Sequence, residues 1–169
     1  MHKVKMMSGL MVLCAALAFA VQPASAVEPG ANAPELDVGG QSGNVKLSAF
    51  HGKVVYLDFW ASWCGPCKRS FPWMNEMQKR YGEQGFQVIA VNLDAKHGDA
   101  EEFLKATPAT FTIGFDPAGA SARAFGVKGM PSSLLIGADG RVIAQHEGFN
   151  ESDKAELEKR IASQLKSTK

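Results

Sequence analysis

The sequence has few cysteines and tyrosines and almost no net charge. Its 169 residues include 3 Cys and 2 Tyr, and 18 Lys and Arg stand against 17 Asp and Glu, for a formal net charge of +1. Lys and Arg do not cluster, so the chain lacks the basic footprint of a nucleic-acid-binding protein. Beyond the N-terminus, no apolar run is long enough to span a bilayer. Nucleic-acid binding and multispan membrane classes are therefore excluded, and the length fits one globular domain.

The N-terminus has the pattern of a secretory signal peptide. Lys3 and Lys5 form a short basic region, residues 10–21 are apolar, and Ala24-Ser25-Ala26 fits a small-x-small cleavage site. Cleavage after Ala26 predicts a mature domain of residues 27–169. Losing two basic residues leaves 16 against 17 acidic ones, a net charge of −1. The alternative is an uncleaved N-terminal anchor, although the apolar stretch is short for a spanning helix.

Two cysteines remain in the predicted mature domain, Cys64 and Cys67, in the pattern C-x-x-C. Cys14 is expected to be discarded with the signal peptide. A disulfide within C-x-x-C closes a loop of four residues, so it has little value as a structural staple. Zinc would need two further ligands. The remaining histidines form no paired motif: His51, His97 and His146. The pattern favours redox chemistry, with a metal site and an inert structural disulfide as alternatives.

Hydrophobic periodicity places the cysteine pair between a strand and a helix. Residues 54–59 (VVYLDF) are a short, mostly apolar run that predicts a buried strand. From Pro66 onward, apolar residues recur at steps of three and four as far as Tyr81, which predicts a helix. Cys64 is thus expected at the N-terminus of this helix.

The rest of the sequence predicts an alternation of strands and helices. Predicted strands cover residues 87–94, 112–115, 133–136 and 141–145, and predicted helices cover residues 99–107, 116–126 and 152–165. The second helix is expected to start at Asp99, in a capping-box-like pattern, and the third at Asp116-Pro117. Asp139-Gly140 fits a hairpin turn between the last two strands. The order indicates an α/β fold that ends in an antiparallel hairpin.

Several motifs together resemble the thioredoxin-fold oxidoreductases. They are FWASWCGPCK at residues 59–68, Asp58 six residues before the first cysteine, Pro72, and Gly129-Met130-Pro131. Three further features resemble the exported TlpA/ResA-like branch of this family. They are Ala33-Pro34, the segment at residues 47–53 that leads into the first core strand, and the strand-and-helix segment at residues 87–107. The resemblance implies a three-layer α/β fold in residues 27–169, with a mixed central sheet flanked by helices. It also implies an N-terminal β extension and a central strand-helix insertion.

The expected position of the cysteines assigns their roles. The positive end of a helix dipole stabilises a thiolate and lowers the pKa of a cysteine there, so Cys64 is the predicted nucleophile. Cys67, one turn into the helix, is shielded and is expected to resolve the mixed disulfide. Gly65 and Pro66 keep the turn between the two cysteines tight, and proline fits the helix start because the N–H that it lacks would have no partner there. Both residues are also expected to contact the substrate.

Asp58 is the third candidate catalytic residue. Near the end of a buried strand, a carboxyl group holds its proton more tightly than in water and can exchange it with Cys67 during resolution. The alternation of side chains along the strand leaves open that Asp58 faces solvent. Two positions depart from the family pattern. Ala90 stands where thioredoxins carry a lysine near this aspartate, and Ser70 where many TlpA/ResA-like sequences have a glutamate.

Pro131 resembles the cis-proline of the family, whose loop lies beside the disulfide. This likeness implies that the backbone of Met130 pairs with an extended substrate segment. Trp63 is expected to shape the docking surface, whereas Trp60 fits either that surface or the core. Other large apolar residues are expected in the core: Phe59, Phe71, Trp73, Met74, Met77 and Phe125. The three histidines are expected at the surface or in loops.

The resemblance implies a periplasmic thiol-disulfide oxidoreductase that acts on protein disulfides or dithiols. A reductase is favoured, as a monomer without metal or cofactor, supplied with electrons by a membrane thiol-reducing donor. The resemblance suggests service to cytochrome c maturation or to copper-site thiols. The alternative within the enzyme class is a thiol oxidase or isomerase. The alternative from another class is a chaperone that binds Cu(I) through the two soft thiolates.

Overall fold

A seven-stranded mixed sheet forms the centre of the molecule, in the order β2-β1-β5-β4-β3-β6-β7. The computed structural model describes residues 27–167, so the predicted signal peptide lies outside the described residues. The strands are β1 (Asp37–Gly40), β2 (Gly43–Lys46), β3 (Val54–Trp60), β4 (Phe86–Asn92), β5 (Thr112–Phe115), β6 (Ser132–Ile136) and β7 (Val142–Glu147). β3 pairs parallel with β4 and antiparallel with β6. The strand that leads to the cysteines is therefore central in the sheet.

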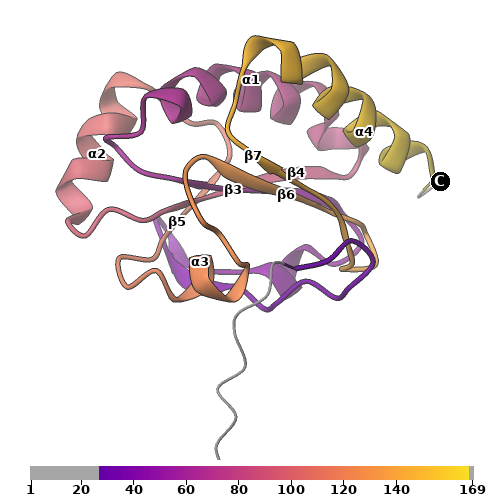
Figure 1. Cartoon of the computed structure of the whole chain (residues 1–169), viewed down its shortest axis with the longest axis horizontal. Helices are drawn as coiled ribbons and strands as arrows, with labels where there is room; N and C mark the ends of the chain where they lie inside the picture. Colours follow the sequence, from indigo (N-terminus) through magenta and orange to yellow (C-terminus); the bar gives the residue numbers. More distant parts are fainter. Residues whose placement is uncertain (1–26, 168–169) are drawn as a thin grey trace, which may run out of the picture.

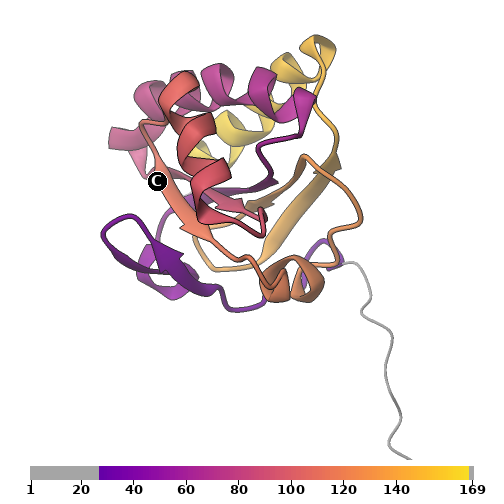
Figure 2. The same ribbon diagram turned by 90° about the vertical axis from the view of Figure 1, so that its left-hand side faces the viewer.

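Helices and the N-terminal segment cover the two faces of this sheet (Figure 1). The helices α1 (Gly65–Tyr81), α2 (His97–Ala106) and α4 (Lys154–Ser167) lie on one face. The short helix α3 (Ala120–Ala124) lies on the other, as the turned view in Figure 2 also shows, and the β1–β2 hairpin extends the sheet beyond β5. Three short 3-10 helices complete the fold: η1 (Leu47–Phe50), η2 (Gly82–Gln84) and η3 (Glu151–Asp153). The result is a thioredoxin-like three-layer α/β fold with an N-terminal β extension.

Strand β3 is buried along its whole length because both faces of the sheet are covered. All seven of its residues are buried. Tyr56 and Trp60 belong to the apolar cluster on the side of α1, whereas Leu57 and Phe59 belong to the cluster on the opposite side. Asp58 alternates in step with Tyr56 and Trp60. It therefore projects toward the layer that contains α1 and the cysteines.

Two helices start elsewhere than their capping signals predict. α2 begins at His97 after Lys96, which makes no side-chain cap, so Asp99 lies in the first turn instead of at the N-cap. There its charge suits the helix dipole. Asp116 accepts a hydrogen bond from the Ser121 backbone N–H at 2.7 Å across an intervening turn. Helix α3 consequently begins only at Ala120.

The other predicted boundaries lie within two residues of the observed ones, with β5 matched at both ends, and the expected core is confirmed. Phe59, Phe71, Trp73, Met74, Met77 and Phe125 are all buried. The last helical segment starts as η3, capped by Asn150 and Asp153, before α4 begins. His146 lies in β7 and is partly exposed, with its ring beside Asp153. Within residues 27–167, no helix is long and apolar enough to cross a membrane.

Candidate thiol-disulfide active site

The two cysteines form a disulfide at the start of α1, so the structure shows the oxidised form. Their Cα atoms are 5.3 Å apart. Cys64 is the N-cap residue of α1, and its Sγ accepts a hydrogen bond from the Cys67 backbone N–H at 3.2 Å. Cys64 is 5% exposed, whereas Cys67 is fully buried. A partner sulfur can therefore reach Cys64 and not Cys67.

The start of α1 is arranged to stabilise negative charge on Cys64 after reduction. The first turn contains Pro66 and no acidic residue, so no side chain there offsets the positive end of the helix dipole. A backbone N–H already points at the Cys64 sulfur. Both features favour a thiolate over a thiol, and the thiolate is the form that attacks a disulfide.

A buried polar cluster anchors the loop before Cys64 to the end of β4. The Asp94 carboxylate accepts hydrogen bonds from the Ser62 backbone N–H at 2.8 Å and from the Ser62 hydroxyl at 3.0 Å. The Asn92 side chain donates to the same carboxylate at 2.7 Å. Sequence reasoning missed this cluster. The available signal was that Asn92 and Asp94 are polar residues at the end of a buried strand.

Asp58 is buried and its environment favours the neutral carboxylic acid. The residue is 1% exposed, and its Oδ2 atom has no hydrogen-bond partner. In the sheet it stands opposite Ala90 of β4 and Ser133 of β6. Burial raises the pKa of Asp58 well above its usual range. The predicted buried position is confirmed, and Ala90 supplies no cation from the neighbouring strand.

The loop that carries Pro131 contains the expected cis peptide bond, between Met130 and Pro131. Met130 is partly buried against the apolar cluster that includes both cysteines. The Gly148 backbone N–H donates to the Pro131 carbonyl at 2.8 Å, and the Ser132 hydroxyl donates to the Gly129 carbonyl at 2.7 Å. These bonds hold the loop against β6 and β7.

The two tryptophans near the disulfide have different environments. Trp63 directly precedes Cys64 and is 73% exposed, whereas the other large apolar side chains recorded for residues 27–167 are at least partly covered. Trp60 is fully buried, with its ring centroid 4.9 Å from that of Phe71 and 4.7 Å from that of Phe103. Trp60 is therefore a core residue, and Trp63 is available for contact with another molecule.

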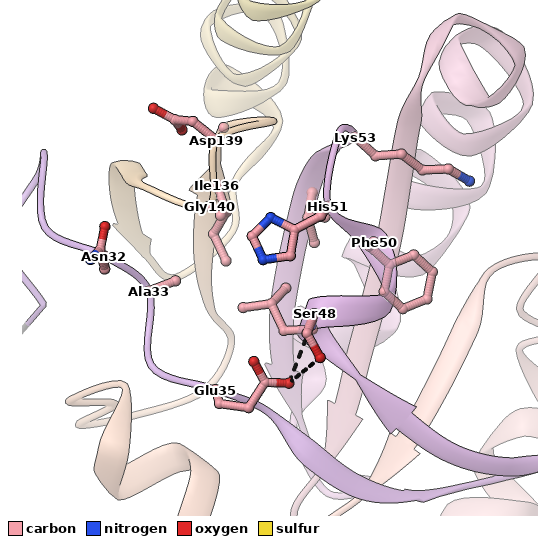
Figure 3. A pocket seen from close by; sticks show the side chains of 13 residues that line it. Asn32, Ala33, Glu35, Ser48, Phe50, His51, Lys53, Ile136, Asp139 and Gly140 are labelled. Carbon is pink, nitrogen blue, oxygen red and sulfur yellow. Dashed lines mark hydrogen bonds between the residues drawn. The ribbon is translucent and has the colours of Figure 1, made fainter.

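A cavity of about 310 Å³ lies at the other end of β3 (Figure 3). Its lining includes Val55 near the start of that strand, and neither cysteine borders it. Glu35 accepts a hydrogen bond from the Ser48 hydroxyl at 3.0 Å, and the His51 ring points into the cavity. Across residues 27–167, no three His, Cys, Asp or Glu side chains converge as metal ligands.

The fold, the disulfide at a helix N-terminus and the cis-proline loop define a thioredoxin-fold thiol-disulfide oxidoreductase. The model of the Redoxin family matches residues 24–161. The thiol-disulfide oxidoreductase ResA of Bacillus thuringiensis is 34% identical over 155 residues, which cover 88% of each chain. The chain belongs to the Redoxin family.

Solved structures agree with this assignment. A structure from Chlorobium tepidum, described as thiol:disulfide interchange protein DsbE, is 56% identical with a TM-score of 0.82, and the match covers 83% of this chain and 99% of that one. A structure from Bacteroides thetaiotaomicron, described as a protein disulfide isomerase, is 30% identical with a TM-score of 0.75. That match covers 83% of this chain and 91% of the other. These likenesses extend over almost all of the described domain.

Proposed function

We propose that the protein is a periplasmic reductase of exported protein disulfides. The observation that carries the proposal is the asymmetry of the pair: Cys64 reaches the surface beside the exposed Trp63, and Cys67 lies buried behind it. The signal-peptide pattern supports export. The Gly65-Pro66 dipeptide supports the reducing direction, because it resembles thioredoxin. Cytochrome c apoprotein thiols and copper-site thiols are the proposed clients, and a membrane thiol protein is the proposed electron donor.

Reduction of a client proceeds in two exchange steps. The Cys64 thiolate attacks one sulfur of the client disulfide, the client S–S bond breaks, and the other client sulfur leaves as a thiolate. Asp58 in its carboxylate form takes the proton of the Cys67 thiol, because the raised pKa makes this carboxylate a stronger base than an exposed one. The Cys67 thiolate then attacks Cys64 Sγ, which releases the second client sulfur and forms the disulfide seen in the structure. Two electrons pass from the cysteine pair to the client.

The reduction potential of the pair tests the direction. We expect a value near that of thioredoxin, about −270 mV, and not near the value of about −120 mV typical of a strong periplasmic oxidant. The protein is equilibrated in dithiothreitol or glutathione buffers, and tryptophan fluorescence reports the redox state because Trp63 adjoins Cys64. A value more than about 100 mV above that of thioredoxin would indicate an oxidase or isomerase.

Two controls accompany this measurement. The double variant Cys64→Ser/Cys67→Ser should show no redox transition in fluorescence. An anaerobic titration with Cu(I) tests the chaperone alternative. Tight stoichiometric copper binding without reduction of insulin would replace the enzyme assignment by a copper-binding one.

Trp63→Ala should weaken the docking of protein substrates without altering the chemistry. An exposed tryptophan beside the reactive sulfur offers a large apolar contact area, and such residues often dominate binding energy. We expect KM for a protein disulfide to rise about tenfold, which corresponds to about 1.4 kcal/mol. The rate with a small aromatic disulfide should stay within about twofold, and Trp63→Phe should largely restore KM. Equal losses with both substrates would contradict a docking role.

A further inference from the structure

A row of polar side chains crosses the sheet from Asp58 to the surface. Ser133 of β6 stands directly opposite Asp58 of β3, and His146 of β7 stands directly opposite Ser133. Directly opposed residues of antiparallel strands have Cβ atoms about 5 Å apart on the same face of the sheet. Asp58, Ser133 and His146 are therefore consecutive neighbours in one row.

Ser133 and His146 each have a polar partner beside this row, and both line a small cavity. The Tyr56 hydroxyl donates to Ser133 Oγ at 2.8 Å in a buried environment. His146 Nε2 lies 3.3 Å from Asp153 Oδ2, and both side chains are partly exposed. Tyr56, Ser133 and His146 also line a cavity of about 10 Å³, which is close to the volume that one water needs. The strand register thus places polar side chains side by side from Asp58 to the partly exposed His146.

The surroundings make this row distinctive. Around it the same face is apolar, with Val54, Leu135, Leu157 and Ile161 buried in one cluster. On the other side of Asp58, the neighbour in the sheet is the fully buried Ala90, which carries no proton. Among these neighbours in the sheet, the groups that can move a proton lie on the β6 and β7 side.

We propose that Ser133 and His146 carry protons between Asp58 and the solvent. This inference rests on the proposed function, in which Asp58 takes a proton from Cys67. A client attached to Cys64 covers the surface beside the disulfide and blocks proton release to solvent there. A second route for the proton is therefore useful during resolution. The proton leaves Asp58 for the Ser133 hydroxyl oxygen as the hydroxyl proton moves on to the imidazole of His146, directly or through one water. The imidazole then releases a proton to solvent.

The charges around the row suit this role. Asp153 remains a carboxylate near His146, because the hydrogen bond from the Asn150 backbone N–H lowers its pKa. Burial raises the pKa of Tyr56 far above its usual range, so its hydroxyl stays neutral and donates to Ser133.

Two charged residues of α4 complete the surroundings of His146. Arg160 and Glu156 line the neighbouring groove and pair with each other at 2.9 Å. Tyr56 lies two residues before Asp58 on the same face of β3, in the cluster that also contains Cys67. His146 positions the proton and touches neither substrate nor sulfur.

The test measures resolution of a mixed disulfide in a single turnover. The reduced protein is mixed with a client peptide disulfide, and attack by Cys64 releases the first peptide thiol. Release of the second peptide thiol, which reports the resolution step, is followed over pH 5–9. We expect His146→Ala and Ser133→Ala each to slow release about tenfold, less than the roughly hundredfold or more typical of a direct general acid or base, because both residues act through Asp58. Added imidazole should restore the rate of His146→Ala, because it fills the vacated surface position, but not the rate of Ser133→Ala.

Matched controls separate this role from a structural one. His51→Ala removes an exposed histidine at the remote cavity and should leave the rate within about twofold, with no imidazole effect. His146→Gln keeps a polar side chain without a titratable ring and should be slow with an unchanged reduction potential. A wild-type rate in His146→Ala, or a slow rate that imidazole does not restore, would overturn the proposal. If the wild-type protein itself released no peptide thiol, the proposed function would fail instead.

Discussion

Cys64→Ser should abolish reduction of protein disulfides, whereas Cys67→Ser should form a covalent adduct and then stop. Only Cys64 combines surface access with the start of a helix, so its loss removes the attacking thiolate. Loss of Cys67 leaves the attack intact and removes the group that resolves the mixed disulfide. We expect both variants to lose at least about a thousandfold in turnover, as is usual when a nucleophile is removed.

Insulin reduction measures the turnover, and mass spectrometry of non-reduced samples detects the adduct. The adduct should appear with Cys67→Ser and be absent with Cys64→Ser and with the double variant. An adduct that formed with Cys64→Ser and not with Cys67→Ser would reverse the assigned order of attack.

Asp58→Asn should stabilise the protein at alkaline pH and slow the resolution step. The folded-state pKa of Asp58 is raised by burial, so the folded protein binds more protons than the unfolded chain above about pH 4. Stability in the wild type consequently falls as pH rises through this range up to the folded-state pKa. Asparagine carries no charge, so the variant does not lose stability in this way. We expect its free energy of unfolding to exceed that of the wild type by roughly 1–3 kcal/mol at pH 8–9, since burial of one unpaired ion costs several kcal/mol.

Urea unfolding at several pH values measures this effect, and Asp94→Asn is the matched control. Asp94 is also a buried aspartate, but it accepts bonds from Ser62 and Asn92, so the same substitution should destabilise by roughly 1–3 kcal/mol. In turnover assays, Asp58→Asn should slow release of the client while the initial attack by Cys64 is unchanged. Equal stability of the wild type and Asp58→Asn at every pH would show that the carboxyl is solvated.

Local sequence patterns predicted the element that carries the chemistry. The apolar run at residues 54–59 and the helical periodicity from Pro66 placed Cys64 at a helix start, and the structure has it as the N-cap of α1. Such patterns work here because strand and helix periods depend on neighbours within a few residues. The start of α3 was missed because Asp116 caps across a turn, at Ser121, instead of at the next residues.

The burial of Asp58 needed the tertiary structure. Alternation along β3 shows which residues share a face with Asp58, but it does not show whether that face is covered. The packing of α1 and α4 over the sheet decides this, and with it the raised pKa of the carboxyl.

The sequence by itself determined the redox pair, its spacing, the strand and helix that hold it, and through family resemblance the fold. The tertiary structure decided which polar groups meet. Ser62 and Asp94 are 32 residues apart, and Tyr56 and Ser133 are 77 apart. The row from Asp58 through Ser133 to His146 depends on the register of three strands. Register is set by packing and turn geometry across the whole sheet, so no local pattern in the chain encodes these contacts.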